Sequence, residues 1–173
     1  MGTRHLTVVR LGGKYKIAQY GQRDGYQEGQ GITVLEFVHK LKNGCLEHFK
    51  NNLQKCRWIT DDERKELEYK VNYGLLKNWK KVYPQFHRDT GAEILDFVLK
   101  STSEIVLADS FDFAFDHTWC EYIWCIDLDN NVFGLYVGDD ENKALYPAQT
   151  WKIDEAPTKE EFLDAFKEKE DTQ

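Results

Sequence analysis

The sequence predicts an α+β fold: a mainly antiparallel sheet built from N- and C-terminal hairpins, with a central helical layer on one face. Period-two alternation of apolar residues marks segments near both ends of the chain, and helix-start signals with helical periodicity lie between them. The 173 residues, 41% of them hydrophobic and 14% aromatic, suffice for one well-packed core. We therefore expect a single globular domain over residues 1–173.

The first element is a β-hairpin, formed by HLTVVRL (5–11) and KYKIAQY (14–20) around Gly12-Gly13. Two glycines adopt the positive φ angles of a two-residue hairpin turn at little steric cost. The register that this turn implies pairs Arg10 with Tyr15, Val8 with Ile17 and Leu6 with Gln19. One face, expected to meet the core, then carries Leu6, Val8, Tyr15 and Ile17.

Polar groups converge at the open end of this hairpin. The pairing brings Arg4 and His5 beside Gln19 and Tyr20, at the start of the loop AQYGQRDGYQEGQG (18–31). Such a cluster can form a ligand site, because amide groups donate and accept hydrogen bonds while a tyrosine offers a stacking face. We expect these four side chains to lie close together.

The rest of the loop has two interpretations. As a ligand site it offers Gln22 for polar contacts, Arg23 beside Asp24 for charge and Tyr26 for stacking. The loop also leads into a helix expected to start at Thr33, where free N–H groups and the helix dipole favour an anion. In the structural interpretation, the glutamines and the Arg23-Asp24 pair satisfy one another and hold a long connection to the sheet.

Four Thr-x-x-Glu capping boxes, each followed by helical periodicity, mark helix starts. The boxes are Thr33 with Glu36, Thr60 with Glu63, Thr90 with Glu93 and Thr158 with Glu161. A further helix over about 46–56 follows the Asn43-Gly44 stop signal. The helix after Thr60 should end before Pro84 and bury Leu67, Val71, Leu75 and Trp79.

Strand periodicity returns in EIVLADS and in CEYIWCIDLDNNVFGLYVG, where Asp129-Asn130-Asn131 supplies the turn of a second hairpin. A last helix follows Pro157, and its tail, residues 168–173, is expected to fray. Strands at both ends with helices between them predict that the two hairpins join in one sheet.

Composition and charge argue against several classes of function. A net charge of −7 repels nucleic-acid phosphate and acidic membranes unless a local basic patch intervenes, so we expect no bulk nucleic-acid binding. No window holds the roughly 20 apolar residues that span a bilayer, and the first residues lack a secretory signal, so a cytoplasmic location is expected. The cysteines lack metal-site spacing, so we expect reduced thiols and no metal or other cofactor: Cys45, Cys56, Cys120 and Cys125.

A second polar constellation lies in SFDFAFDHTW and comprises Asp109, Asp112, Asp116 and His117. Oxygen-rich clusters suit magnesium or calcium, and an Asp-His pair can act as a general base. Because phenylalanines alternate with the aspartates, we interpret the segment as having a buried aromatic side and a solvated acidic side. Nucleophilic catalysis is also disfavoured, since Cys120 and Cys125 lie in an aromatic strand and removal of Met1 would expose only Gly2. We assign no catalytic residue.

The segments MGTRHLTVV, KIAQYGQRDGYQEGQG, RDTGAEILDFV and WCEYIWCIDLDNNVFGLYVG resemble an uncharacterised family of phage, bacterial and fungal proteins. In that family the loop reads AQYGQWDGYP, and the late strand reads like EWAYVIDLD before a turn. The resemblance runs from the N-terminus to about Gly138 and implies no established activity. Arg23 stands where the family has Trp, and Gln27 where it has Pro, so we do not expect an aromatic contact of the family's loop to carry over to this chain.

We therefore expect a non-catalytic protein that binds a small polar or anionic, nucleotide-like ligand. With the resemblance to phage proteins, sequestration of a host signalling nucleotide, a form of immune evasion, is one use of such binding. The alternatives are an amide or phosphoester hydrolase using Asp and His groups of the late hairpin, and a protein-interaction module. A homodimer through edge pairing of the second hairpin is a further expectation. The candidate ligand-binding residues are Arg4, His5, Gln19, Tyr20, Gln22, Arg23, Asp24, Tyr26 and Thr33.

Overall fold

The structure, a computed structural model, describes the backbone of residues 2–170 and the side chains of residues 2–167. The tail expected to fray, residues 168–173, falls at this boundary and its side chains lie outside the described residues. Within the described part of the chain, no helix is long and apolar enough to cross a membrane.

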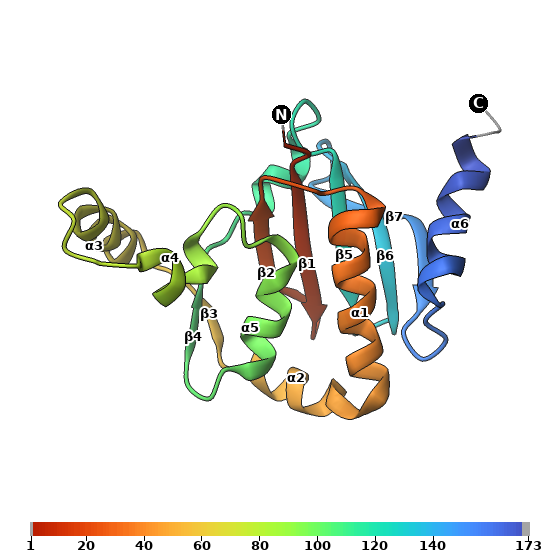
Figure 1. Cartoon of the computed structure of the whole chain (residues 1–173), viewed down its shortest axis with the longest axis horizontal. Helices are drawn as coiled ribbons and strands as arrows, with labels where there is room; N and C mark the ends of the chain where they lie inside the picture. Colours follow the sequence, from red (N-terminus) through yellow and green to blue (C-terminus); the bar gives the residue numbers. More distant parts are fainter. Residues whose placement is uncertain (1, 171–173) are drawn as a thin grey trace.

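A five-stranded sheet forms the body of the protein, with the strand order β2-β1-β5-β6-β7 (Figure 1). Its strands are β1 (His5–Leu11), β2 (Lys14–Gly21), β5 (Tyr122–Asp127), β6 (Val132–Asp139) and β7 (Ala144–Lys152). Only the central β1–β5 pair is parallel, and the other three pairs are antiparallel. The α+β class and the joining of the two hairpins in one mainly antiparallel sheet are therefore confirmed, while β7 was not anticipated.

The first hairpin turns at Gly12 and Gly13 as predicted, with φ angles of 65° and 73°. Arg10 pairs with Tyr15, but a bulge between Val9 and Arg10 then shifts the register by one residue. The other predicted pairs are therefore wrong: the observed pairs are Val9 with Ile17, Val8 with Ala18, Thr7 with Gln19 and Leu6 with Tyr20. Because strand side chains alternate, a shift of one residue moves each side chain of the shifted strand to the other face.

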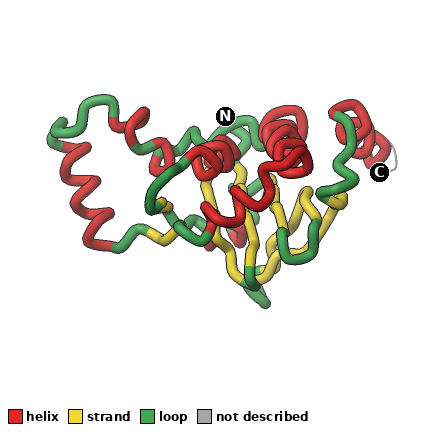
Figure 2. Tube along the Cα trace, turned by 90° about the horizontal axis from the view of Figure 1, so that it is seen from below, coloured by secondary structure: helices red, strands yellow, loops and turns green. Residues whose placement is uncertain are grey.

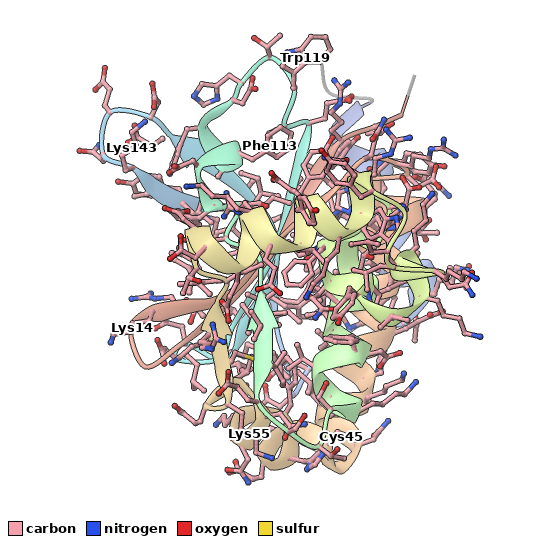
Figure 3. The ribbon with its side chains drawn as sticks, turned by 90° about the vertical axis from the view of Figure 1, so that its left-hand side faces the viewer. Lys14, Cys45, Lys55, Phe113, Trp119 and Lys143 are labelled. Atoms are coloured by element: carbon pink, nitrogen blue, oxygen red, sulfur yellow. The ribbon has the colours of Figure 1, made fainter. Side chains whose placement is uncertain are left out.

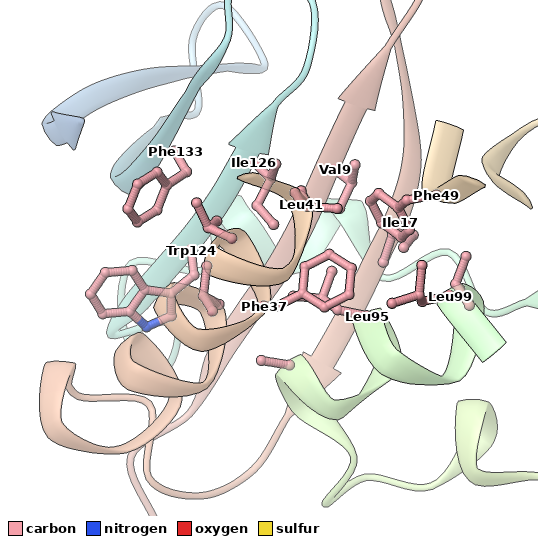
Figure 4. Close-up of a cluster of buried hydrophobic side chains, with 14 of the residues drawn as sticks. Val9, Ile17, Phe37, Leu41, Phe49, Leu95, Leu99, Trp124, Ile126 and Phe133 are labelled. Atoms are coloured by element: carbon pink, nitrogen blue, oxygen red, sulfur yellow. The ribbon is translucent and has the colours of Figure 1, made fainter. Parts of the chain in front are cut away.

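Both faces of this hairpin are buried, which corrects the expectation of one core face. Val9 and Ile17 belong to the main core beneath the helices (Figure 4). Leu6 and Val8 face the opposite side, where a short 3₁₀ segment, η5 (Phe111–Phe115), covers the sheet with phenylalanine side chains. β1 is thus buried on both faces and is more enclosed than β2.

The helical layer packs on one face of the sheet, with helices above the strands in Figure 2. It consists of α1 (Ile32–Lys40), α2 (Leu46–Leu53), α5 (Ile94–Lys100) and α6 (Lys159–Glu170). Apolar side chains from α1, α2 and α5 meet those of the strands in a continuous core. At about 25 cal/mol per Å² of buried apolar surface, this core is the main favourable term for folding.

Two of the four capping boxes are present. Thr60 and Thr158 each accept a hydrogen bond from the backbone N–H of the glutamate three residues on, and each glutamate bonds back. Thr33 instead lies inside α1, which continues from a π-helical turn, η1 (Gln27–Gly31), and Thr90 donates to the Pro84 carbonyl. The predictions at Thr33 and Thr90 were wrong, because tertiary contacts outweighed the local capping pattern.

The structure departs most from the predicted fold in an arm that projects from the body (Figures 1 and 2). It carries α3 (Asp61–Asn72) and α4 (Trp79–Val82), and a two-stranded sheet of β3 (Cys56–Trp58) and β4 (Ile105–Leu107) joins it to the body. The predicted long helix breaks at Gly74, which has a φ of 65°, and none of its four expected core residues is buried. We define residues 61–83 as the arm.

Candidate functional site

The loop that follows β2 is held down by its own backbone. The Gln22 N–H donates to the Arg88 carbonyl at 2.9 Å, the Gly25 N–H to the Thr3 carbonyl at 3.0 Å, and the Gln30 N–H to the Asp24 carbonyl at 2.7 Å. These bonds join the loop to the N-terminal segment, to the segment before α5 and to itself. The loop is thus a connection held to the fold by its backbone, whereas the structural interpretation had assigned this role to the glutamine side chains and the Arg23-Asp24 pair.

Two side-chain bonds from distant elements fix the same loop. The buried Trp124 indole N–H on β5 donates to the Gly25 carbonyl at 2.7 Å. The Gln30 Oε1 accepts from the Ala92 N–H at 2.8 Å. Because each bond joins positions more than 60 residues apart, it specifies tertiary structure and not just local turn geometry.

His5 lies enclosed beneath this loop, only 1% exposed. Three glycines surround it: a Cβ would lie 2.0 Å from the ring Cε1 at Gly21, 2.8 Å from the His5 Cβ at Gly25 and 2.5 Å from the ring Nε2 at Gly91. Burial lowers the pKa of His5 to about 4. His5 is therefore neutral at pH 7 and closed off from solvent, so it offers no cation to an anionic ligand in this conformation.

The sheet separates the predicted site residues at the open end of the hairpin. Gln19 is buried on the helical side, paired with Thr7, and Arg4 and Tyr20 lie on the η5 side. The expectation that these four side chains lie close together is therefore wrong, because the sheet places His5 and Gln19 on one face and Arg4 and Tyr20 on the other.

Arg4 and Tyr20 line a shallow pocket of about 200 Å³ together with Phe113, Asp116 and Trp119. The Arg4 guanidinium lies 4.4 Å from the centroid of the Trp119 ring, and the Tyr20 and Phe113 rings meet edge to face at 4.9 Å. Figure 3 shows Phe113 and Trp119 at the top of the molecule. This pocket, here called the hairpin-end pocket, combines one guanidinium, three aromatic rings and one carboxylate.

Hydrogen bonds order the loop that supplies Trp119. The Asp116 Oδ1 accepts from the N–H groups of Thr118 and Trp119, both at 3.2 Å, and the Arg4 N–H donates to the Glu121 Oε1 at 3.3 Å. Asp116 thus shapes the turn that carries Trp119, as aspartates commonly do when they bond their own following backbone.

The remaining loop residues lie outside this pocket. Arg23, Asp24 and Tyr26 are exposed, and the Tyr26 hydroxyl donates to the Asp24 Oδ1 at 3.2 Å, which raises the pKa of Tyr26. Gln22 is half-buried. Thr33 faces a separate, smaller hollow of about 90 Å³ between α1 and α5, and its hydroxyl donates to the Gly29 carbonyl.

The acidic constellation of the η5 segment does not converge. Asp109 accepts a bond from the Phe111 N–H, and Asp112 and His117 are exposed. Among the described residues, no group of three or more His, Cys, Asp or Glu side chains is placed to hold a metal ion. Three of the four thiols are poor nucleophiles, because burial raises the pKa of Cys56 to about 11 and of Cys120 to about 12, and also raises that of Cys125.

Sequence reasoning did not anticipate the partners of Arg4 and Tyr20. Phe113, Asp116 and Trp119 lie some 90 or more positions away, and no local pattern connects them with the hairpin. The alternation of phenylalanine and aspartate did indicate an aromatic side to the η5 segment, and that side does pack on β2 through Tyr15 and Tyr20.

Two larger hollows flank the arm, of about 370 and 270 Å³, and both were missed because the arm was expected to be buried. The larger has a mixed rim that includes Glu63, Glu66 and Lys70, and the smaller is mainly apolar, with Leu67, Val71 and Trp79. They lie between α3 and the elements that anchor it.

In comparisons with known proteins, no family model, no curated protein and no solved structure matches this chain significantly.

Proposed function

We propose that the protein binds a small ligand that has a flat ring and a negative charge, in the hairpin-end pocket, and that it binds this ligand without converting it. The observation that carries the proposal is the placement of the Arg4 guanidinium 4.4 Å from the Trp119 ring centroid, in a hollow that Tyr20 also lines. A guanidinium next to the exposed indole of Trp119 and the half-buried ring of Tyr20 suits a nucleotide-like molecule, which carries both an anion and a stacking surface.

Each pocket group has a distinct role in this proposal. Arg4 pairs with the phosphate or carboxylate of the ligand, and Trp119, 48% exposed, stacks on its ring. Asp116 accepts a hydrogen bond from an amino group on the ring edge.

Binding without catalysis is supported by the state of the groups that could react. His5 is enclosed and neutral, and the thiol of Cys120 stays protonated at pH 7. Sequestration of a signalling nucleotide requires only that the protein binds the nucleotide, with no reaction.

Calorimetric titration with nucleoside monophosphates, cyclic dinucleotides and NAD-derived nucleotides tests the proposal, after native mass spectrometry has identified any retained ligand. Arg4→Gln should weaken binding about 10-fold or more, since a hydrogen bond to a charged group contributes roughly 1.5–3 kcal/mol. Trp119→Ala should act similarly, and Arg88→Gln, which removes an exposed charge elsewhere, should leave affinity unchanged. Equal affinity in wild type and both pocket variants, or no binding by any ligand class, would refute the proposal.

A further inference from the structure

Charge is strongly segregated along this chain. Residues 69–88 contain no Asp or Glu and five cations: Lys70, Lys77, Lys80, Lys81 and Arg88. Residues 101–142 contain no Lys or Arg and ten acids: Glu104, Asp109, Asp112, Asp116, Glu121, Asp127, Asp129, Asp139, Asp140 and Glu141. The net charge of −7 therefore conceals one basic segment and one acidic segment.

The basic segment covers only the second part of the arm, residues 69–83, because the first part of α3 carries five acids: Asp61, Asp62, Glu63, Glu66 and Glu68. The exposed apolar side chains of the arm lie in this basic part. None of the residues of α3 is buried. Four large apolar side chains of the arm are more than half exposed: Tyr69, Tyr73, Leu75 and Val82. An apolar surface of this kind, rimmed by charge, typically marks a site of macromolecular contact.

The acidic segment carries an apolar surface of its own. Val137 on β6 pairs across the sheet with Tyr146 on β7, and both are about half exposed. They lie beside the turn of Asp139, Asp140 and Glu141, in which Lys143 pairs with Asp140 and leaves a net negative charge. η5, with Asp112, packs against the same end of β6 through Ala114 and Gly138. We call this surface the acidic end.

We propose that the basic part of the arm, residues 69–83, docks on the acidic end of a second copy of this chain. Opposite charges and exposed apolar side chains face one another in such a contact, and it covers six of the eight exposed large hydrophobic residues among those described. Within one chain the two surfaces lie apart, because the arm projects beyond β2 and the acidic end is at the β6–β7 side of the sheet (Figure 1). Each copy carries both surfaces, so two copies related by a two-fold axis form the contact twice.

Single-stranded nucleic acid is the other occupant that a basic, aromatic surface suggests. Leu75 and Val82 offer no ring on which a base can stack, and the acidic segment repels phosphate. A protein surface packs against the aliphatic side chains of the arm and pairs with its charged groups. A nucleic acid contacts only the cations and the tyrosine rings.

Sedimentation velocity of the full chain over a concentration series tests this contact. The wild type should reach twice the monomer mass, and raising NaCl from about 0.1 to 1 M should weaken association, because the screening length falls from about 10 to 3 Å. Lys80→Glu/Lys81→Glu should weaken self-association at least about 10-fold, as should Tyr73→Ser/Leu75→Ser. Lys42→Glu/Lys100→Glu changes the net charge equally at exposed sites away from the arm and should associate like the wild type.

A charge exchange identifies the partner surface. Asp112→Lys/Glu141→Lys should be monomeric alone, and so should Lys80→Glu/Lys81→Glu, but a mixture of the two should form the heterodimer, because both of its contacts regain opposite charges. A wild type that stays monomeric at about 100 μM, well above the range of typical specific complexes, would overturn the proposal. So would a failure of the mixed variants to associate, or binding of labelled oligothymidylate by the arm without self-association. Ligand affinity at the hairpin-end pocket is a separate measurement, so either proposal can fail alone.

Discussion

Acidification should destabilise this protein through His5. In the folded state burial lowers the His5 pKa from 6.5 to about 4. The unfolded chain, with a pKa near 6.5, therefore takes up a proton before the folded protein does as pH falls. The stability that neutral His5 contributes is complete above pH 6.5 and is lost progressively down to pH 4.

The magnitude follows from the size of this shift. Each pKa unit corresponds to about 1.4 kcal/mol, so a shift of this size amounts to about 3 kcal/mol, against a typical total stability of roughly 5–15 kcal/mol. Protonation would also force a charged ring against Gly21 and Gly91, where no space remains for movement. We expect the loop 18–31 to open before the rest of the fold.

Urea unfolding at pH 7.5, 6, 5 and 4 measures the effect in the wild type and in His5→Gln, which cannot titrate. The free energy of unfolding of the wild type relative to the variant should fall by about 3 kcal/mol over this range, most steeply between pH 6.5 and 4. Carboxylates titrate in both proteins and cancel in the difference. A difference that stays constant with pH, or an NMR titration of the His5 ring with a midpoint near 6.5, would refute the reasoning.

Two substitutions test the packing around the loop, and a labelling experiment tests the burial of Cys125 on β5. Trp124→Phe removes the 2.7 Å bond to the buried Gly25 carbonyl and should cost about 1–3 kcal/mol in urea unfolding. Gly91→Ala, at a φ of 48° and with its new Cβ 2.5 Å from the His5 Nε2, should cost at least about 2 kcal/mol by the same measurement. Cys125, buried and with its thiol pKa raised, should resist alkylation by iodoacetamide at pH 7.5 until the protein is unfolded.

Matched controls separate these effects from general perturbation. Trp119→Phe alters an exposed indole and should change stability by less than about 0.5 kcal/mol. Gly74→Ala adds a Cβ with nothing within 4 Å and should cost only the strain of its positive φ, about 1 kcal/mol. Equal losses at Gly74 and Gly91 would show that the enclosure of His5 adds nothing.

In the first hairpin the local sequence predicted the turn but not the register of the two strands. The Gly12-Gly13 turn was predictable because positive φ is a property of glycine itself. The bulge between Val9 and Arg10 was not, because it adapts β1 to two neighbours at once, β2 and the parallel strand β5. Its consequence is that Ile17 lies with Val9 in the main core, on the face opposite Leu6 and Val8, and not on their face as predicted.

The arm shows that the sequence can predict a helix correctly without predicting where that helix packs. The capping box at Thr60 and the periodicity after it correctly indicated a helix. Periodicity also indicated that Leu67 and Val71 would be buried, yet an apolar stripe states only that a helix needs a partner, not that its own chain supplies one. Leu67 and Val71 are half-buried, and the exposed side chains that motivate the proposed contact with a second copy are Tyr69, Tyr73, Leu75 and Val82.

In the candidate site, too, some features follow from the local sequence and others only from the tertiary structure. The sequence alone determined that Arg4 and Tyr20 lie near each other, because hairpin pairing is local, and it determined the α+β class, the reduced character of the cysteines and the acidic net charge. Only the tertiary structure decided that Phe113 and Trp119 complete their pocket, that Gln19 and His5 turn away from it, and that the glutamine-rich loop is anchored by Trp124. The physical reason is that side-chain direction depends on strand register and on contacts across 90 or more residues, and neither is encoded in any short segment.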